Sequence, residues 1–153
     1  MNRAEPLSTD PADPLRFLQV LWSVEHALQA ASKRMLARIG VTGPQRFVIR
    51  MLGRNPGLAA GEVADRMRID PSTLTGILQR LQNSGLLKRQ TDSEDRRRAV
   101  LVLSDEGRKL DTANDGTIES AIARAMARFS PEQIAVADQV LAALVEELEL
   151  VAR

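Results

Sequence analysis

The spacing of apolar residues in this 153-residue chain changes directly after Gly85. Between Pro14 and that glycine, apolar residues recur every three or four positions, which predicts helices. Residues 86–90 and 99–103 have strand character and flank a polar, charged segment, which predicts a hairpin with a long exposed tip. Helical spacing returns after Ser104. The sequence therefore predicts a mainly α fold with one small β-hairpin.

Prolines, glycines and capping residues mark the ends of the expected helices. Pro14 is a favourable first helical residue, and Gly40 is a natural C-terminal cap. Asp70 and Pro71 form a similar start signal, with Asp70 as the N-cap. The expected helices cover residues 14–39, 44–53, 60–68, 71–83, 104–129 (with Ser104 as the cap) and 131–150, and the fifth contains Gly107 and Gly116 as weak points.

The middle of the chain reads helix, helix, helix, strand, strand, and two of its small helices are joined by a tight turn. This order is that of a winged helix-turn-helix, in which the hairpin is the wing. We therefore expect four segments. They are a flexible N-terminal arm over 1–13, an N-terminal dimerisation helix over 14–43, a winged helix-turn-helix DNA-binding module over 44–103, and C-terminal dimerisation helices over 104–153.

The long flanking helices carry apolar stripes that need a partner surface. Val24, Leu28 and Met35 belong to the stripe of the first helix, and Leu141 and Leu148 to that of the last. A middle module of 60 residues cannot cover all of these stripes, and a second copy of the chain is the most economical partner. We expect a homodimer in which the helices expected at 71–83 of the two copies lie about 34–36 Å apart, the length of one turn of DNA.

One face of the helix expected at 71–83 carries the first candidate DNA contacts. A helical wheel places Leu74, Ile77, Leu78 and Leu81 on the buried face. The opposite face has short polar side chains that suit phosphate oxygens and base edges in a major groove. The alternative is an ordinary solvated face, although such faces usually carry Lys and Glu, and this one has neither. The candidate residues are Ser72, Thr73, Thr75, Gln79, Arg80 and Asn83.

The tip of the hairpin carries the second set of candidate DNA contacts, Arg96, Arg97 and Arg98. An arginine at the end of a rigid ribbon can enter a narrow minor groove, where the negative potential is enhanced. We expect Asp95 to hold such an arginine through a carboxylate–guanidinium pair. The alternative is a solvated loop with scattered charges.

The charges of the chain are divided unequally. The whole chain has a formal net charge of +1, whereas residues 44–103 carry +5 and the two flanks together carry −4. A local excess of positive charge gives affinity for phosphates whatever the total charge is. The competing interpretation is a non-catalytic helical protein–protein interaction module on a winged-helix scaffold. The polar helix face and the arginine tip argue against it, because such interfaces prefer an apolar centre.

The amino-acid composition excludes several classes of functional site. The chain has no cysteine and one histidine, His26, which excludes disulfides, thiol chemistry and a multi-histidine metal site. No catalytic constellation or glycine-rich phosphate loop is present, so we expect no enzyme and no cofactor. The longest aliphatic run, Val140 to Val145, has six residues, and residues 1–13 lack the apolar core of a secretory signal. We therefore expect a cytoplasmic protein without a membrane segment.

The hairpin also resembles a known family. Its residues follow the pattern Asp95-x-Arg97-x-x-x-Leu101-x-Leu103-Ser104-x-x-Gly107. This pattern resembles the wing signature of MarR-family transcriptional regulators, with Ser104 where threonine is commoner. Residues 72–75, 78–81 and 84–86 resemble the recognition helix and exit turn of that family, and the whole resemblance covers about residues 20–128. It implies an obligate homodimer that binds a pseudo-palindromic operator on double-stranded DNA. Such proteins are usually repressors released by a small ligand.

The resemblance also assigns roles to single residues. It implies that the candidates Ser72, Thr73, Thr75, Gln79 and Arg80 meet the major groove, and that Arg97 enters the minor groove, positioned by Asp95. Gly76 departs from the family pattern, since many members carry a larger polar residue, often arginine, at this position. Gln79, Arg80 or the shape of the DNA would then supply more of the specificity.

A ligand site is expected near two pairs of residues with helical spacing. Trp22 and His26 share a face of the first helix, and Arg46 and Arg50 share a face of the second. Regulators similar to this chain often bind aromatic acids between these helices and the DNA-binding lobe, and an aromatic wall with cationic groups suits a carboxylate ligand. The alternative is that Trp22 packs in the core or the dimer interface, His26 is partly exposed, and the arginines are solvated.

Overall fold

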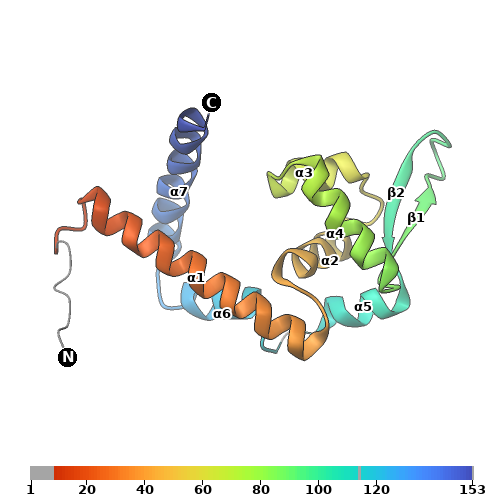
Figure 1. The fold of residues 1–153 in the computed structure, drawn as a ribbon, viewed down its shortest axis with the longest axis horizontal. Coiled ribbons are helices and arrows are strands. Elements are labelled where there is room, and N and C mark those ends of the chain that lie inside the picture. The colour runs from red at the N-terminus through yellow and green to blue at the C-terminus, as the bar shows by residue number, and fades with distance from the viewer. Residues whose placement is uncertain (1–8, 114, 153) are drawn as a thin grey trace. The chain divides into compact units, whose positions relative to one another are not determined.

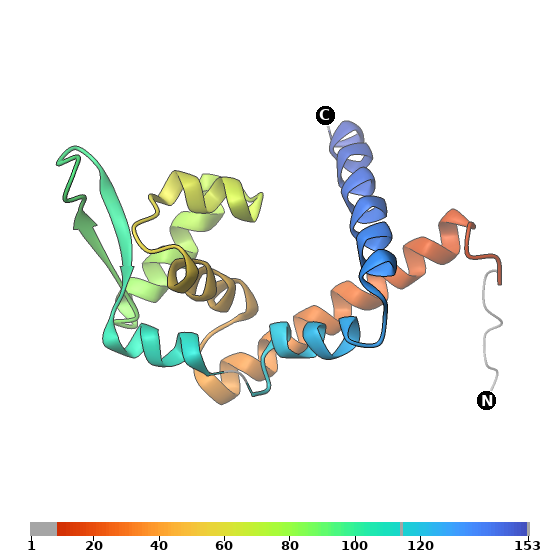
Figure 2. The same cartoon turned by 180° about the vertical axis from the view of Figure 1, so that it is seen from behind.

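A computed structural model describes residues 9–113 and 115–152. They form a mainly helical fold with one antiparallel hairpin, which confirms the expected class (Figures 1 and 2). The chain divides into two compact units, with the boundary between residues 114 and 115. The elements are α1 (Pro14–Ile39), α2 (Gly43–Arg54), α3 (Ala60–Met67), α4 (Pro71–Asn83), β1 (Leu87–Thr91), β2 (Ala99–Leu103), α5 (Asp105–Thr112), α6 (Ile118–Met126) and α7 (Pro131–Val151).

The single helix expected over 104–129 is wrong, because the structure has two helices there, α5 and α6. The break lies between Thr112 and Ile118 and includes one of the two expected weak points, Gly116, whose φ of 70° is in the left-handed region. A glycine adopts this conformation without steric cost, and an α-helix cannot continue through it. Thr117 then starts α6, since its side-chain oxygen accepts the backbone N–H of Ser120 at 3.3 Å.

The core of the first unit lies around α4. Leu74, Leu78 and Leu81 are buried, as the helical wheel predicts, whereas Ile77 is only partly buried at the edge of the core. Each fully buried leucine contributes about 1.5–3 kcal/mol relative to an exposed one. The opposite face of α4 is consequently left to solvent. Buried residues from the neighbouring elements complete this core, among them Val48, Ile49, Leu52, Val63, Leu87, Leu101 and Leu103.

The hairpin is attached to the helices along its lower half. Its strands pair from Leu87 with Leu103 to Thr91 with Ala99. The backbone N–H of Leu101 donates to the carbonyl oxygen of Leu58, in the α2–α3 connection, at 2.8 Å. Both ribbon views show the rest of the hairpin projecting beyond α4 (Figures 1 and 2).

Close packing also fixes α5 at the base of the hairpin. A Cβ atom on Gly107 would lie 2.2 Å from the carbonyl oxygen of Leu86, so only glycine fits at this position. The Ser104 hydroxyl donates to the carbonyl oxygen of Gly85 at 2.6 Å and accepts the Gly107 N–H at 3.0 Å. Although the sequence places α5 within the segment 104–153, the structure packs it against α2 and β2 in the first unit.

The second unit is a helical pair with little interior. Ser130 begins α7 with a capping box, in which its hydroxyl accepts the N–H of Gln133 and its own N–H donates to the Gln133 side chain at 2.9 Å. No described residue of α6 or α7 is buried. Within the part of the chain that the structure describes, no helix combines the length and apolar character needed to cross a membrane.

Candidate nucleic-acid interface

Helix α4 presents to solvent the polar face expected from the sequence. The helix begins at Pro71, and the carbonyl of Asp70 accepts the N–H of Leu74 at 3.1 Å. Asp70 is the N-cap residue, as expected, and its side chain makes no cap hydrogen bond. Thr75 donates its hydroxyl to the Pro71 carbonyl at 2.8 Å, which leaves only acceptor capacity for a ligand. The exposed residues are Ser72, Thr73, Thr75, Gly76, Gln79, Arg80 and Asn83.

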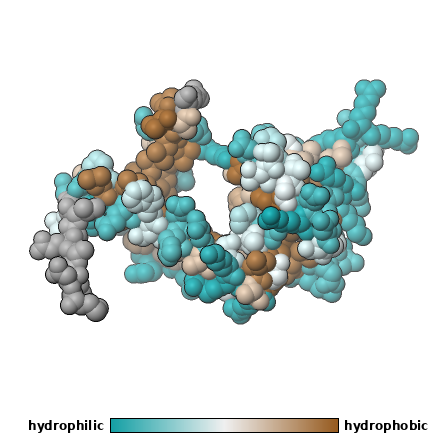
Figure 3. Space-filling model, viewed as in Figure 1, coloured by the Kyte–Doolittle hydropathy of each residue, from teal (hydrophilic) through white to brown (hydrophobic). Residues whose placement is uncertain are grey.

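The tip of the wing presents two exposed arginines, Arg96 and Arg97. The space-filling view shows this end of the hairpin as strongly hydrophilic (Figure 3). Asp95 accepts the backbone N–H of Arg97 at 2.9 Å. The expected pair between Asp95 and a guanidinium is not present among the described residues. A carboxylate in a tight turn is well placed for the N–H two residues further on, so Asp95 positions Arg97 through its backbone.

The third candidate of the wing, Arg98, faces back toward the protein. Its guanidinium donates to Oε2 of Glu62 in the first turn of α3, and its Nη1 lies 3.6 Å from Oδ2 of Asp92. The side chains of Arg98 and Glu62 are 40% and 44% exposed, so the pair lies at the surface. Arg98 also closes the loop, because its carbonyl accepts the N–H of Asp92 at 2.9 Å. The structure thus separates Arg98 from the two exposed arginines before it.

Two carboxylates at this contact favour their charged forms. The hydrogen bond from the Ala59 N–H, at 2.7 Å, lowers the pKa of Glu62, and Arg98 lowers it further. The hydrogen bond from the Glu94 N–H lowers the pKa of Asp92, with a smaller effect of Arg98. For both groups the hydrogen bonds lower the pKa by more than desolvation raises it.

The two arginines of the expected ligand site have structural contacts instead. Arg46 is only 1% exposed, and its guanidinium donates to the carbonyl oxygens of Leu110 and Ala113 at the end of α5. Arg50 donates to the carbonyl and, at 2.7 Å, to the carboxylate of Asp111. Carbonyls at a helix C-terminus lack helical partners and favour cations. This placement does not favour the expected role of the arginines as cations for a carboxylate ligand.

Trp22 and His26 lie on the surface of α1. Trp22 is 64% exposed, and His26 is exposed one turn further on. Helix α1 contacts α2 near its own C-terminal end, where Ser32 accepts the first N–H of α2 at 2.8 Å. His26 lies six residues before that contact, or about 9 Å along the helix axis. Trp22 and His26 therefore precede the part of α1 that contacts the start of α2, whereas the guanidinium groups of α2 bind at the end of α5.

The sequence alone does not reveal the partners of Arg98 and Arg50. Glu62 stands at the third position of α3, where a capping role is readable from sequence, but its contact with Arg98 spans 36 positions. Nothing in the sequence points to Asp111 as a partner of Arg50. In the described ranges, no cluster of three or more His, Asp or Glu side chains could hold a metal ion.

Comparison with known proteins agrees with this geometry. The family model described as the MarR family matches residues 39–98. TtmR, an HTH-type transcriptional regulator of Methylorubrum extorquens, is 36% identical over 109 residues, which are 71% of this chain and 54% of TtmR. The chain thus spans about half the length of that relative.

Solved structures share the fold. PcaV, a transcriptional regulator of Streptomyces coelicolor solved with its natural ligand, has a TM-score of 0.67 and 26% identity, with 91% of this chain and 96% of PcaV covered. MepR of S. aureus, solved in complex with DNA, has a TM-score of 0.71 and 19% identity, with 86% and 97% covered. From its wing, its recognition helix and these likenesses, the chain belongs to the MarR family of transcription regulators, which are not enzymes.

Proposed function

We propose that this chain acts as a homodimeric, sequence-specific regulator of transcription that binds double-stranded DNA. One observation carries the proposal: a single unit combines an exposed, carboxylate-free face of α4 with an exposed arginine tip on the neighbouring hairpin. The module that holds both, residues 44–103, has a net charge of +5. Such a surface attracts phosphates and can read base edges. This role would place the protein with DNA in the cytoplasm.

The two exposed elements suit different grooves. Ser72 and Thr73 at the start of α4 suit phosphate oxygens, whereas Gln79 and Arg80 are long enough for base edges in the major groove. Arg97 suits a narrow minor groove beside it. MepR, which shares the fold, was solved on DNA, and this supports the assignment.

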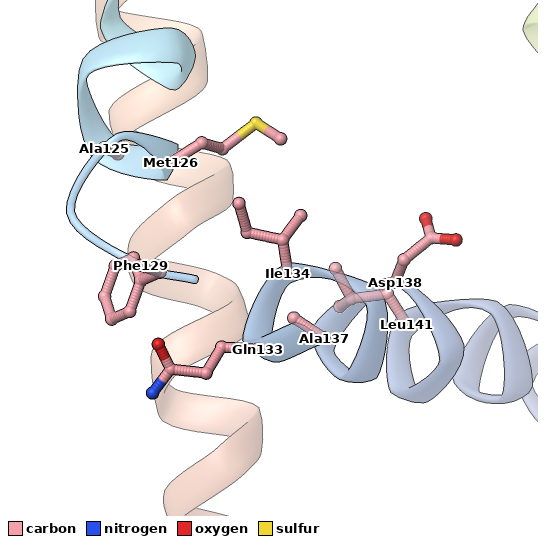
Figure 4. Close-up of a pocket in the computed structure, with 8 residues that line it drawn as sticks. All are labelled: Ala125, Met126, Phe129, Gln133, Ile134, Ala137, Asp138 and Leu141. Carbon is pink, nitrogen blue, oxygen red and sulfur yellow. The ribbon is translucent and has the colours of Figure 1, made fainter. Parts of the chain in front are cut away.

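A homodimer is the second part of the proposal, and exposed apolar surface supports it. The second unit has a pocket of about 500 Å³ lined mainly by apolar side chains from α6, the α6–α7 connection and α7 (Figure 4). Figure 3 shows much of α7 as hydrophobic. Patches of this kind on a folded protein mark interaction sites, and we assign this one to a second copy of the chain. The exposed apolar residues of α6, the α6–α7 connection and α7 include Ile122, Met126, Phe129, Val136, Val140, Leu141, Val145 and Leu148.

We propose further that the dimer is a repressor released by a small ligand. A dimer that covers its operator excludes other proteins from that DNA, and PcaV was solved with a natural ligand. An aromatic acid remains the proposed ligand class, now with Trp22 and His26 as its contacts. Titration with a panel of aromatic acids should quench or shift Trp22 fluorescence. An unchanged spectrum across the panel would reject this ligand class.

Selection of bound sequences from a random DNA pool tests the DNA-binding function. We expect enrichment of pseudo-palindromes whose half-sites are separated by one turn of DNA, about 10–10.5 base pairs from centre to centre. The same experiment reports half-site spacing and dimer symmetry. A purified protein without salt-dependent DNA binding at low ionic strength would show that the function is wrong.

Two variants distinguish contacts with the DNA backbone from contacts with base edges that determine sequence preference. Arg97→Ala should weaken binding to most sequences and lower the slope of log K against log salt by about one unit. Gln79→Ala should cost about 1–3 kcal/mol of binding free energy and relax the preference at one position in each half-site. Arg34→Ala, at an exposed position of α1, is the matched control and should leave both quantities unchanged. Equal effects at positions 34 and 97 would contradict the assignment.

A further inference from the structure

The tip of the wing needs a second attachment to keep a fixed direction. An isolated two-stranded hairpin is marginally stable in water. The hydrogen bond between Leu101 and Leu58 holds the middle of this hairpin, because Leu101 pairs with Arg89, and it does not reach the loop beyond Thr91 and Ala99. Arg98 provides the contact nearer the tip, because its guanidinium reaches Glu62 on α3. Glu62 is itself held, since the same Oε2 atom accepts the N–H of Ala59 at 2.7 Å.

We propose that Arg98, Glu62 and Asp92 form a wing latch that fixes the direction of the hairpin tip relative to α3 and α4. In this assignment Arg98 is a positioning residue, and Arg97 is the arginine that contacts DNA. The guanidinium of Arg98 has two carboxylate partners, Glu62 at Nη2 and Asp92 at Nη1, and the exposed Arg97 has none among the described residues. The inference rests on the proposed DNA-binding function.

Removal of the Glu62 charge tests the wing latch, because electrostatics alone and the wing latch predict opposite changes in DNA affinity. Glu62 is an acidic residue in the module that faces DNA, so electrostatics alone predicts tighter DNA binding when its charge is removed. The wing latch predicts weaker binding, because Arg97 loses its fixed position. Glu62→Gln is the suitable change, since an amide oxygen can still accept the Ala59 N–H and preserve the start of α3.

The first experiment measures the wing without DNA. The chain has no cysteine, so Ser93→Cys, at an exposed position of the wing loop, gives one site for a nitroxide spin label. Arg98→Ala and Glu62→Gln should each narrow the electron paramagnetic resonance spectrum of the label, which reports a more mobile tip. Glu106→Gln, which removes the exposed pair with Lys109 at 2.7 Å on α5, is the matched control and should leave the spectrum unchanged. Wild-type spectra from both latch variants would overturn the inference.

The second experiment measures DNA affinity and its salt dependence. Arg98→Ala and Glu62→Gln should each raise Kd about two- to fivefold per half-site, the range of a surface ion pair. The double variant should bind no more weakly than Arg98→Ala alone, because both changes remove one interaction. Arg98→Ala should keep the salt slope of the wild type, whereas Arg97→Ala should lower it.

These measurements separate failure of the inference from failure of the function. Tighter binding by Glu62→Gln, or a salt slope lowered by Arg98→Ala as much as by Arg97→Ala, would overturn the positioning role. A wild-type protein that binds no DNA would reject the proposed function, and the spin label would still decide whether the latch holds the wing.

Discussion

Arg68 occupies a backbone conformation that few side chains adopt. Its φ of 52° lies in the left-handed region, and it is the non-glycine residue with positive φ among those that the structure describes. It closes α3 in this conformation, where its N–H donates to the Asp65 carbonyl at 3.2 Å. A left-handed L-residue costs about 1–2 kcal/mol. The turn between α3 and α4 therefore stores strain that a glycine would not have.

Replacement of this arginine should stabilise the protein. Arg68→Gly should raise the free energy of unfolding by about 0.5–1 kcal/mol, because the relief of strain exceeds the entropy that glycine adds to the unfolded chain. Urea denaturation measures this change. Arg66→Gly, two residues earlier in the last turn of α3, is the control and should lower the stability by about 1 kcal/mol. A loss of stability at both positions would contradict the interpretation.

At the scale of elements, two arginines of α2 hold the end of α5. Arg46→Met preserves much of the apolar stem but leaves the Leu110 and Ala113 carbonyls without their charged donor. We expect a loss of about 1–3 kcal/mol in the free energy of unfolding, measured by denaturation in urea. Arg54→Met, at an exposed position of the same helix, should change it by less than about 0.5 kcal/mol. Similar losses from the two variants would mean that burial of Arg46 has no special role.

The stability that Glu62 contributes, through the Ala59 N–H and through Arg98 on the hairpin, should depend on pH. Because folding lowers the pKa of Glu62, its carboxylate contributes fully above the ordinary value of 4.5, and the contribution disappears as the pH falls through the lowered pKa. The difference in unfolding free energy between the wild type and Glu62→Gln should be constant near neutral pH and shrink in acid. Urea titrations across this range measure it. If this difference in unfolding free energy grew as the pH fell, the prediction would be contradicted.

Local sequence signals predicted the helices and strands well. Features that depend on contacts between distant segments were not predicted. Prolines, caps and the change of period after Gly85 place each helix and strand up to Leu103 within about two residues. The break at Gly116 was not predicted, since a glycine inside a helical pattern is either tolerated or a terminus. For the site, periodicity identified the exposed face of α4, but it could not show that Arg98 faces Glu62 or that Arg46 is buried. Those outcomes depend on tertiary packing between distant segments.

At the scale of the whole molecule, the exposed apolar surface of the second unit should control assembly. Leu141→Glu places a carboxylate on the pocket lining of α7, where a second copy would have to bury it, so we expect the dimer to dissociate. Analytical ultracentrifugation measures the mass, and circular dichroism verifies that the helices remain. Gln139→Glu adds the same charge to an exposed polar position of α7 and should leave the dimer intact. A monomeric wild type, or a dimeric Leu141→Glu protein, would contradict the assignment.

The double use of one Glu62 oxygen has a consequence for sequence divergence. That atom starts α3 through the Ala59 N–H and also accepts from Arg98, so a change at position 62 disturbs a helix as well as a wing contact. A change at position 98 disturbs only the wing. Among close relatives, position 98 should therefore be the more variable of the two, and an arginine there should occur together with an acidic residue at position 62. Evolutionary changes in the direction of the wing would then begin with substitutions on the hairpin, and the start of α3 would stay intact.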